Sequence, residues 1–369
     1  MSAPDQSPPT YAWEPTTDFL AGKYGLPRES IVRFDVNTSP LPPDLRYVLA
    51  GSFDPALCEY PPSDYAALVD AAAGAYGVDV DEILPTAGAD EALDLTARAF
   101  LREGSVAVGA VPTYAMYRIV TEQRGATFRP VPRLSAENGF GLDIPALVAA
   151  SRGVDLVWLC EPNNPTGAYE PAERIADLLD LLAAEADRDG RPAPAVVVDE
   201  AYAEFVGRSV LPLRARYQRL VVIRTLSKAH ALAGARVGFA VARPETLAPI
   251  MSFRAPASVS TVSAALATAS LLRPELAAAN VVRLAQQRAR LIDDLAQIGW
   301  LPYPSEVNFI LIRFASPAAA ESAAEALLRR GLVPRSFGSD HPFADCLRLT
   351  VRSAQENDRL VAAARGIPA

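Results

Sequence analysis

Short apolar runs recur through the first two thirds of the chain and are separated by segments with helical periodicity. Their length and composition predict buried strands at residues 105–110, 155–160, 195–198, 220–223 and 237–241. Between them, residues 171–186 predict an amphipathic helix, because Ile175, Leu178 and Leu182 share one face. Buried strands that alternate with helices predict an α/β fold, with a mostly parallel sheet covered by helices on both faces.

Other segments carry helix and strand signals of their own. Helices are expected at residues 18–24 and 65–76, from a loop at 86–89 to residue 100, and at 114–123. Extended segments are expected at residues 31–37 and 126–131. Gly25 and Gly77 follow the first two helices, at the position where glycine commonly ends a helix.

The pattern changes after about Pro256. Residues 261–298 predict a long helix interrupted at Pro274, and a further helix at 318–330 lies between expected strands at 307–314 and 346–351. This order predicts a smaller α+β domain. We therefore expect an N-terminal arm (residues 1–44) that joins the small domain, a large ligand-binding domain (45–258) and a small C-terminal domain (259–369).

Composition and charge argue against several classes of protein. Of the 369 residues, 50% are hydrophobic and 21% are charged, as in a globular enzyme with a sizeable core. The net charge of −8 argues against non-specific nucleic-acid binding, which needs clustered positive charge. We expect no membrane association, because no segment approaches the roughly 20 apolar residues of a span and the N-terminus has no apolar signal core.

Cysteine and histidine usage favours neither a disulfide framework nor a metal site. Cys58, Cys160 and Cys346 are far apart and odd in number, which favours a reducing cytoplasm. The two histidines, His230 and His341, do not stand in a metal-binding motif. We expect no metal, and we expect His230 to line a pocket rather than to act as a catalyst.

Lysine is scarce in this chain, and one of the two lysines has surroundings suited to chemistry. These are Lys23 and Lys228, against an abundance of arginine. Unlike arginine, lysine can lose its proton and attack a carbonyl as a neutral amine. Lys228 follows an apolar run, and the nearby Ser227 and Arg236 can donate to phosphate oxygens. This stretch predicts a lysine that holds an aldehyde cofactor as a Schiff base; the alternative is a surface lysine beside a strand.

Polar motifs stand where several of the predicted strands end. Asn164 and Asp199 follow or end two strands, as Lys228 follows a third. Because ligands in such sheets bind beyond the carboxyl ends of the strands, one pocket could collect these three side chains. The helix start at Ala89 and Asp90 offers backbone N–H groups to a phosphate, although alone it is more simply an ordinary loop-to-helix junction.

A pyridoxal phosphate ring needs definite partners, and the chain offers a candidate for each. Asp199 is suited to face the ring nitrogen and keep it protonated. Asn164 and Tyr202 can donate to the ring oxygen, and Tyr114 can stack on the ring. Each has a plainer interpretation, with Asp199 as a helix-capping acid and the two tyrosines as core or rim aromatics.

Together, and in this order, the motifs resemble those of fold-type I aminotransferases, and most closely the histidinol-phosphate aminotransferase family. The matching segments are Gly88–Glu91, Pro112–Tyr117, Pro162–Gly167, Asp199–Tyr202, Thr225–Arg236 and Cys346–Thr350. The similarity covers nearly the whole chain from about Tyr11. It implies a homodimeric enzyme that uses pyridoxal 5'-phosphate to move an amino group between small-molecule amino compounds and 2-oxo acids, and we expect this enzyme in the cytoplasm.

The resemblance also implies a role for each residue that meets the cofactor. Lys228 would hold it covalently and later shuttle a proton between the substrate carbon and the cofactor, and Asp199 would pair with the ring nitrogen. Asn164 and Tyr202 would bind the ring oxygen, and Tyr114 would stack. The cofactor's phosphate would be bound by four residues, namely Ala89, Asp90, Ser227 and Arg236.

Five further residues are implied at the substrate side of the site. Tyr60 matches a tyrosine that reaches into the neighbouring subunit's site. Arg348 would bind a substrate carboxylate, and Arg335 and Tyr11 would bind a substrate phosphate. Asn37 matches an asparagine that closes over the substrate.

The chain departs from the family pattern in four places, all near the substrate end. They are Asn37-Thr-Ser-Pro40 in place of Asn-Glu-Asn-Pro, Glu59 in place of an arginine, Ala257 in place of a tyrosine, and Thr10 before Tyr11 in place of a proline. Transamination of aromatic amino acids and decarboxylation of threonine phosphate therefore stay open as alternatives. A sensor that only binds the cofactor is disfavoured, because the chain has no room for a DNA-binding module before residue 30.

Overall fold

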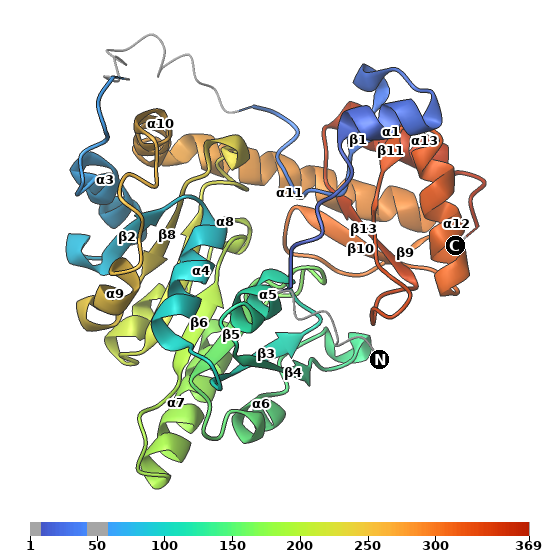
Figure 1. Ribbon diagram of the computed structural model, residues 1–369. Coiled ribbons are helices and arrows are strands. Elements are labelled where there is room, and N and C mark those ends of the chain that lie inside the picture. Colours follow the sequence, from blue (N-terminus) through green and yellow to red (C-terminus); the bar gives the residue numbers. More distant parts are fainter. Residues whose placement is uncertain (1–8, 43–57, 369) are drawn as a thin grey trace, which may run out of the picture.

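The computed structural model describes residues 9–42 and 58–368, which contain two main sheets (Figure 1). In the described residues the larger sheet has seven strands, in the order β2-β8-β7-β6-β5-β3-β4. They are β2 (Ile83–Thr86), β3 (Val106–Val111), β4 (Thr127–Pro132), β5 (Leu156–Cys160), β6 (Ala195–Asp199), β7 (Leu220–Thr225) and β8 (Gly238–Val241). The pairs from β4 to β7 are parallel, and β8 is antiparallel to both β2 and β7. The expectation of an α/β fold with a mostly parallel sheet is confirmed.

The central strands are buried because helices cover both faces of this sheet. Every residue of β5, β6 and β7 is buried, as their nearly continuous apolar sequences predict. One face packs against α3 (Ala66–Tyr76), α6 (Ile144–Ala150), α7 (Ala172–Arg188) and α10 (Thr261–Leu271). The other face packs against α4 (Ala89–Phe100), α5 (Met116–Glu122) and α9 (Pro244–Met251).

Local sequence sets the ends of the helices near the N-terminus. Helix α1 (Thr17–Tyr24) begins after Thr16, whose side chain accepts a hydrogen bond from the Phe19 backbone N–H at 3.1 Å. It ends at Gly25, which takes the left-handed conformation, and α3 ends in the same way at Gly77. The helices predicted at residues 18–24 and 65–76 are therefore confirmed.

The C-terminal part of the chain packs around a second sheet, which is antiparallel. Its described strands follow the order β12 (Arg335–Ser336), β13 (Cys346–Thr350), β10 (Phe309–Arg313) and β9 (Leu301–Pro302). This core also includes α11 (Pro274–Gln297), α12 (Pro317–Leu328) and α13 (Ala354–Ala364). Helix α10 ends at Leu271 and α11 begins at Pro274, which confirms the predicted interruption.

The N-terminal segment joins this C-terminal part rather than the larger sheet. Strand β1 (Val32–Arg33) pairs in parallel with β11 (Leu332–Val333), and the Tyr24 hydroxyl of α1 donates to Glu325 Oε2 of α12 at 2.8 Å. The Phe34 backbone N–H extends the pairing by donating to the Val333 carbonyl at 2.8 Å. β1 is shorter than the strand predicted at 31–37, and Asn37 at the end of that range has a φ of 52°, which is not extended.

Several elements of the structure were not predicted from the sequence. They include β2, α6, α9 and α13. Strand β2 has four residues and lies against the loop that opens α4, so its signal merges with that of the loop. Helix α9 begins with Pro244 and contains Pro249, which hides its periodicity. The helix predicted at 114–123 begins later, at Met116, which leaves Tyr114 in the preceding loop.

Strands β5, β6 and β7 are parallel, so their carboxyl ends meet at one edge of the larger sheet. Asn164, Asp199 and Lys228 all lie at this edge. Among the helices described, none combines the length and apolar character that a membrane span requires. In the same residues, no group of three or more His, Cys, Asp or Glu side chains could hold a metal ion.

Candidate active site

Lys228 lies three residues beyond the end of β7, in a setting that favours its neutral amine. Its Nζ is 5.7 Å from the centroid of the Tyr202 ring. Burial, followed by the positive charges of Arg348 and Arg236, lowers the pKa of the Lys228 amine to about 8. About a tenth of such an amine is uncharged at pH 7, against well under a thousandth for an exposed lysine. Lys228 is thus able to act as a nucleophile.

Asp199 ends β6 and is held on both carboxylate oxygens. The Tyr117 hydroxyl donates to Oδ2 at 2.8 Å, and the Ala201 backbone N–H donates to Oδ1 at 3.0 Å. Burial raises the pKa of Asp199 to about 6, and these two hydrogen bonds oppose that rise because they favour the anion. A buried, oriented carboxylate is the partner that a protonated ring nitrogen needs.

Asp90, in the first turn of α4, joins two other predicted residues. The Arg236 guanidinium donates from Nη2 to Asp90 Oδ2 at 2.9 Å. The Tyr114 hydroxyl donates to Asp90 Oδ1 at 3.0 Å. Residues from the β2–α4 turn, the loop before α5 and the segment before β8 therefore meet at one corner of the site.

Two glycines allow the backbone at this corner to approach closely. At Gly88 φ is 84°, and a Cβ there would lie 2.6 Å from Arg236 Nη2. A Cβ at Gly238 would lie 2.6 Å from the Gly88 carbonyl carbon and 2.7 Å from Ala89 N. The start of α4 therefore stays open beside a guanidinium, as phosphate binding requires.

Ser227, whose Oγ lies 2.9 Å from Thr225 Oγ1, is the hydroxyl predicted to bind the cofactor's phosphate. The start of α4, the Arg236 guanidinium and the Ser227 hydroxyl together fit a bound phosphate ester.

Arg348 reaches from β13 of the smaller sheet to the edge of the larger one. Its Nη1 donates to Asn164 Oδ1 at 2.6 Å, and its Nη2 donates to the Asp35 carbonyl. Its guanidinium carbon lies 5.3 Å from the centroid of the Phe309 ring. Burial lowers the pKa of Arg348 to about 10, because the negative charges near this guanidinium do not fully compensate for its loss of water. An incoming carboxylate would supply that charge.

Asn37 connects the N-terminal segment to both halves of the site. Its Nδ2 donates to the Tyr202 hydroxyl at 3.1 Å, and its Oδ1 accepts from Thr350 Oγ1 at 3.1 Å. The Asn308 side chain donates to the Asn37 carbonyl at 3.1 Å. Asn37 and Tyr202 are both buried.

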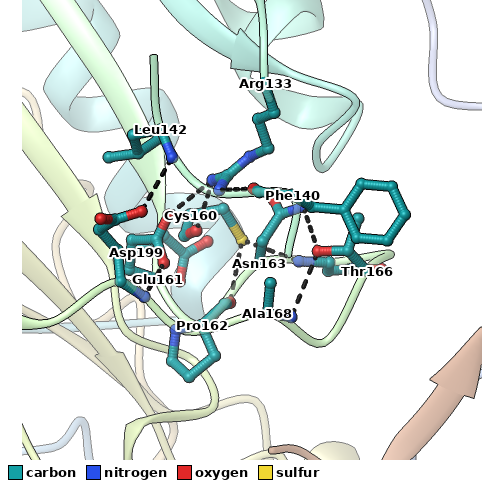
Figure 2. Close-up of polar contacts among 12 residues, drawn as sticks. Arg133, Phe140, Leu142, Cys160, Glu161, Pro162, Asn163, Thr166, Ala168 and Asp199 are labelled. Atoms are coloured by element: carbon teal, nitrogen blue, oxygen red, sulfur yellow. Dashed lines mark hydrogen bonds and ion pairs between the residues drawn. The ribbon is translucent and has the colours of Figure 1, made fainter. Parts of the chain in front are cut away.

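The loop that carries Asn164 rests on a buried ion pair that the sequence did not reveal (Figure 2). Arg133 Nη2 donates to Glu161 Oε1 at 2.6 Å, and the same nitrogen donates to the Cys160 carbonyl at 3.1 Å. Both side chains of the pair are almost completely buried. Asn163, next to Asn164, donates to Thr166 Oγ1 at 2.9 Å. These contacts fix the path of the chain between β5 and α7.

The structure brings together only some of the residues that were predicted to bind the substrate. Arg335 is paired with the Glu14 carboxylate on the N-terminal segment. The Tyr11 ring contacts the Tyr114 ring edge-on, with centroids 6.5 Å apart. Tyr60 is 90% exposed, so this chain provides little contact for its ring. The His230 ring contacts α10, where its Nδ1 lies 2.8 Å from Ser270 Oγ.

Tyr117, Arg133 and Glu161 contribute to the site although sequence reasoning gave them no role. Tyr117 stands three residues after Tyr114 in a matching segment, so a helical turn could have indicated it. Arg133 and Glu161 are 28 residues apart, and the sequence holds no signal for their pairing.

A partly buried lysine, an oriented acid and an open anion-binding corner at the carboxyl edge of a mostly parallel sheet define a pyridoxal-phosphate-dependent enzyme of fold type I. Comparison with known proteins gives the family. Residues 37–363 match the family described as aminotransferase class I and II, and the chain belongs to it.

Relatives and solved structures agree with this assignment. A histidinol-phosphate aminotransferase of Xanthomonas campestris pv. campestris is 37% identical over 84% of this chain and 85% of its own length. One of Roseiflexus castenholzii is 34% identical over 96% of this chain and 95% of its own. The crystal structure of the Sinorhizobium meliloti histidinol-phosphate aminotransferase in complex with pyridoxal-5'-phosphate has a TM-score of 0.85 and 25% identity, covering 96% of this chain and 95% of that one.

Family membership settles the chemistry at the level of class. The expectations of an aminotransferase, of pyridoxal phosphate as its cofactor and of small-molecule amino and 2-oxo substrates are confirmed.

Proposed function

We propose that this chain is a histidinol-phosphate aminotransferase. It would transfer the amino group of histidinol phosphate to 2-oxoglutarate, which gives imidazole acetol phosphate and glutamate, and would catalyse the reverse reaction. The names of its relatives support this substrate. The structural observation that carries the proposal is the pairing of β12 with β13, which sets Arg335 directly opposite Arg348. Like charges in this position repel one another. Two facing cations are therefore suited to substrates that bring a carboxylate or phosphate.

The bound cofactor would supply an electron sink that makes the hydrogen on the substrate carbon acidic. Lys228 would hold the cofactor's aldehyde carbon through Nζ. Once released, Nζ would accept the proton of the substrate carbon and deliver it to the cofactor. Asp199 would keep the ring nitrogen charged, and Asn164 and Tyr202 would donate to the ring oxygen. The remaining cofactor contacts would be the stacking residue and the phosphate residues, namely Tyr114, Ala89, Asp90, Ser227 and Arg236.

The substrate would be bound mainly by charge. Arg348 would bind the carboxylate of glutamate, and Arg335, with Tyr11, would bind the phosphate of histidinol phosphate. Asn37 would close over the substrate from the N-terminal segment. Because Glu14 holds Arg335 in the present structure, the substrate phosphate would have to displace that carboxylate.

The covalent proposal is tested by borohydride reduction of the protein loaded with pyridoxal phosphate, followed by peptide mass mapping. The label should lie on Lys228; a label on Lys23, or none, contradicts the proposal. Lys228→Ala should keep the fold and lose turnover by roughly 10²–10⁴-fold, since a placed proton-transfer base contributes that much.

The substrate proposal needs a separate assay. Turnover should be highest with histidinol phosphate and should need a 2-oxo acid acceptor. Phenylalanine and tyrosine test the aromatic alternative, and threonine phosphate tests the decarboxylase alternative. Carbon dioxide released from threonine phosphate without an acceptor would exclude a transaminase with the proposed substrate.

We also propose that the enzyme works in the cytoplasm as a homodimer of two-domain subunits, with the arm at residues 1–44, the large domain at 45–258 and the small domain at 259–369. The exposure of the Tyr60 ring supports a partner surface, because a second copy of the chain could cover a ring that this chain leaves in solvent. Mixing Tyr60→Ala with Lys228→Ala chains should restore activity if Tyr60 completes the partner's site. A monomer in sedimentation analysis would contradict the dimer.

A further inference from the structure

Tyr117 is buried beneath the site and points its hydroxyl at the central acid. It lies in α5, and its Oη donates to Asp199 Oδ2 at 2.8 Å. Burial and the Asp199 charge raise the pKa of Tyr117 well above its usual value, so the hydroxyl keeps its proton and acts as a donor.

The Tyr117 ring has little freedom to turn away from Asp199. It stacks on the Trp158 ring of β5, with centroids 5.6 Å apart and an interplanar angle of 12°. Trp158 Nε1 donates to Thr121 Oγ1 at 3.0 Å, and Thr121 in turn donates to the Tyr117 carbonyl at 2.7 Å. All three side chains are fully buried, so this arrangement presents the hydroxyl in one fixed place.

The hydroxyl also completes the set of groups that orient the acid. The Ala201 N–H holds Oδ1, and Tyr117 holds Oδ2. Each carboxylate oxygen can accept two hydrogen bonds, so an acceptor position remains for a ligand. Tyr117 also lies close to the Cys160 thiol, at the start of the loop that leads to Asn164.

We propose that Tyr117 is a positioning residue for the aminotransferase, because its hydroxyl holds the Asp199 carboxylate in one orientation and in its charged form. This role rests on the proposed function, in which Asp199 faces the cofactor's ring nitrogen. Without the hydroxyl, the anion loses a donor and the carboxylate more readily takes the proton that should stay on the ring. The residue acts through Asp199 and does not itself meet the substrate.

The test uses Tyr117→Phe, which removes one oxygen and keeps the ring that stacks on Trp158. Tyr217→Phe is the matched control, because the buried Tyr217 hydroxyl also donates one hydrogen bond, to the Pro194 carbonyl at 3.2 Å, in the core of the larger sheet. Both variants are loaded with pyridoxal phosphate labelled with ¹⁵N in the ring. The ¹⁵N chemical shift then reports protonation of that nitrogen independently of turnover.

In the wild type and Tyr217→Phe, the ring nitrogen should give the shift of a protonated pyridine. In Tyr117→Phe the shift should move toward that of a neutral pyridine. The kcat should fall roughly 10- to 100-fold, the size expected for a hydrogen bond to a charged group, and KM should change far less. A wild-type shift and kcat in folded Tyr117→Phe would overturn the proposal.

A double-mutant cycle separates a role through Asp199 from general packing. If Tyr117 acts through the carboxylate, Tyr117→Phe should have little further effect in an Asp199→Asn background. An undiminished effect there would show that packing is responsible and would reject the positioning role. Borohydride labelling of Lys228 in the wild type keeps the two proposals apart: no label defeats the proposed function, whereas a label with an unaffected Tyr117→Phe defeats only the role of Tyr117.

Discussion

Lys228 is a single amine whose charge depends on the groups packed around it. Its pKa of about 8 comes from burial and from the cations Arg348 and Arg236. These causes disfavour the ammonium form, so the reactive neutral amine should appear at lower pH than in an exposed lysine. In a Lys23→Arg background, where Lys228 is the only lysine, its acetylation rate should rise with pH with a midpoint near 8. Mass spectrometry of the labelled peptide measures it.

The same titration identifies the cause of the shift. After burial, the charge of Arg348 is the largest cause of the lowered Lys228 pKa. Arg348→Gln removes that charge, so the Lys228 midpoint should move to higher pH. A midpoint near the ordinary value of 10.5 in both proteins would show that the amine is not desolvated as described.

Glu14 is predicted to weaken binding of anionic substrates, because its carboxylate already pairs with Arg335. Both side chains are partly exposed, so the ion pair is weak and its removal should lower the KM for histidinol phosphate roughly 2- to 5-fold. Glu14→Gln in steady-state assays tests this, with Glu29→Gln as an equal change of charge at an exposed residue of the same segment. An unchanged or higher KM in Glu14→Gln alone would argue against competition at Arg335.

The loop between β5 and α7 depends on the buried pair of Arg133 and Glu161. Arg133→Met should lower the free energy of unfolding by about 3–5 kcal/mol at pH 8, because the Glu161 carboxylate is left buried without its partner. Burial already raises the pKa of Glu161, and Arg133 opposes that rise. Without Arg133 the carboxyl should protonate at higher pH, so the loss should be smaller at pH 5.5 than at pH 8. Urea denaturation of both proteins at each pH measures the difference.

The double variant Arg133→Met/Glu161→Gln serves as the control for this pair. It removes both charges, so it should recover part of the stability lost in Arg133→Met. If the two changes simply add, the pair does not couple and the loop is held in another way.

At the scale of elements, sequence reasoning succeeded where the periodic signal was long or strongly apolar. Helix α7 and strands β5 to β7 bury the residues that their patterns indicated. It failed for β2 and α9, which are short or interrupted by proline. The direction of β8 was also beyond the sequence, because an apolar run has the same pattern in a parallel and an antiparallel pair.

At the scale of the whole molecule, Asn37 connects three parts of the chain that are distant in sequence. Its side chain bonds Tyr202 and Thr350, and its φ is 52°. Asn37→Gly should cost about 1–3 kcal/mol of stability through the lost hydrogen bonds. Asn37→Ala should cost about 1 kcal/mol more, because alanine is strained at positive φ. Urea denaturation compares the two, and an alanine variant as stable as the glycine variant would contradict this strain.

The candidate site shows the same division between local and long-range information. Lys228, Asp199 and Asn164 could be placed at strand ends from the sequence, because the carboxyl edge of a parallel sheet collects them. The contact of Arg348 with Asn164 spans 184 positions and joins two sheets, so no local pattern could reveal it. The ion pair of Arg335 with Glu14 was likewise not expected.

By itself the sequence determined the fold class, the ends of the strongest elements and the residue types that the chemistry requires, because these depend on local periodicity and on what each side chain can do. Only the tertiary structure decided how those residues are held. The second oxygen of Asp199 is bound by Tyr117, and the pKa of Lys228 is lowered by burial and by Arg348 from another sheet. Orientation and pKa depend on which groups lie within a few ångströms, and folding alone brings such distant residues together.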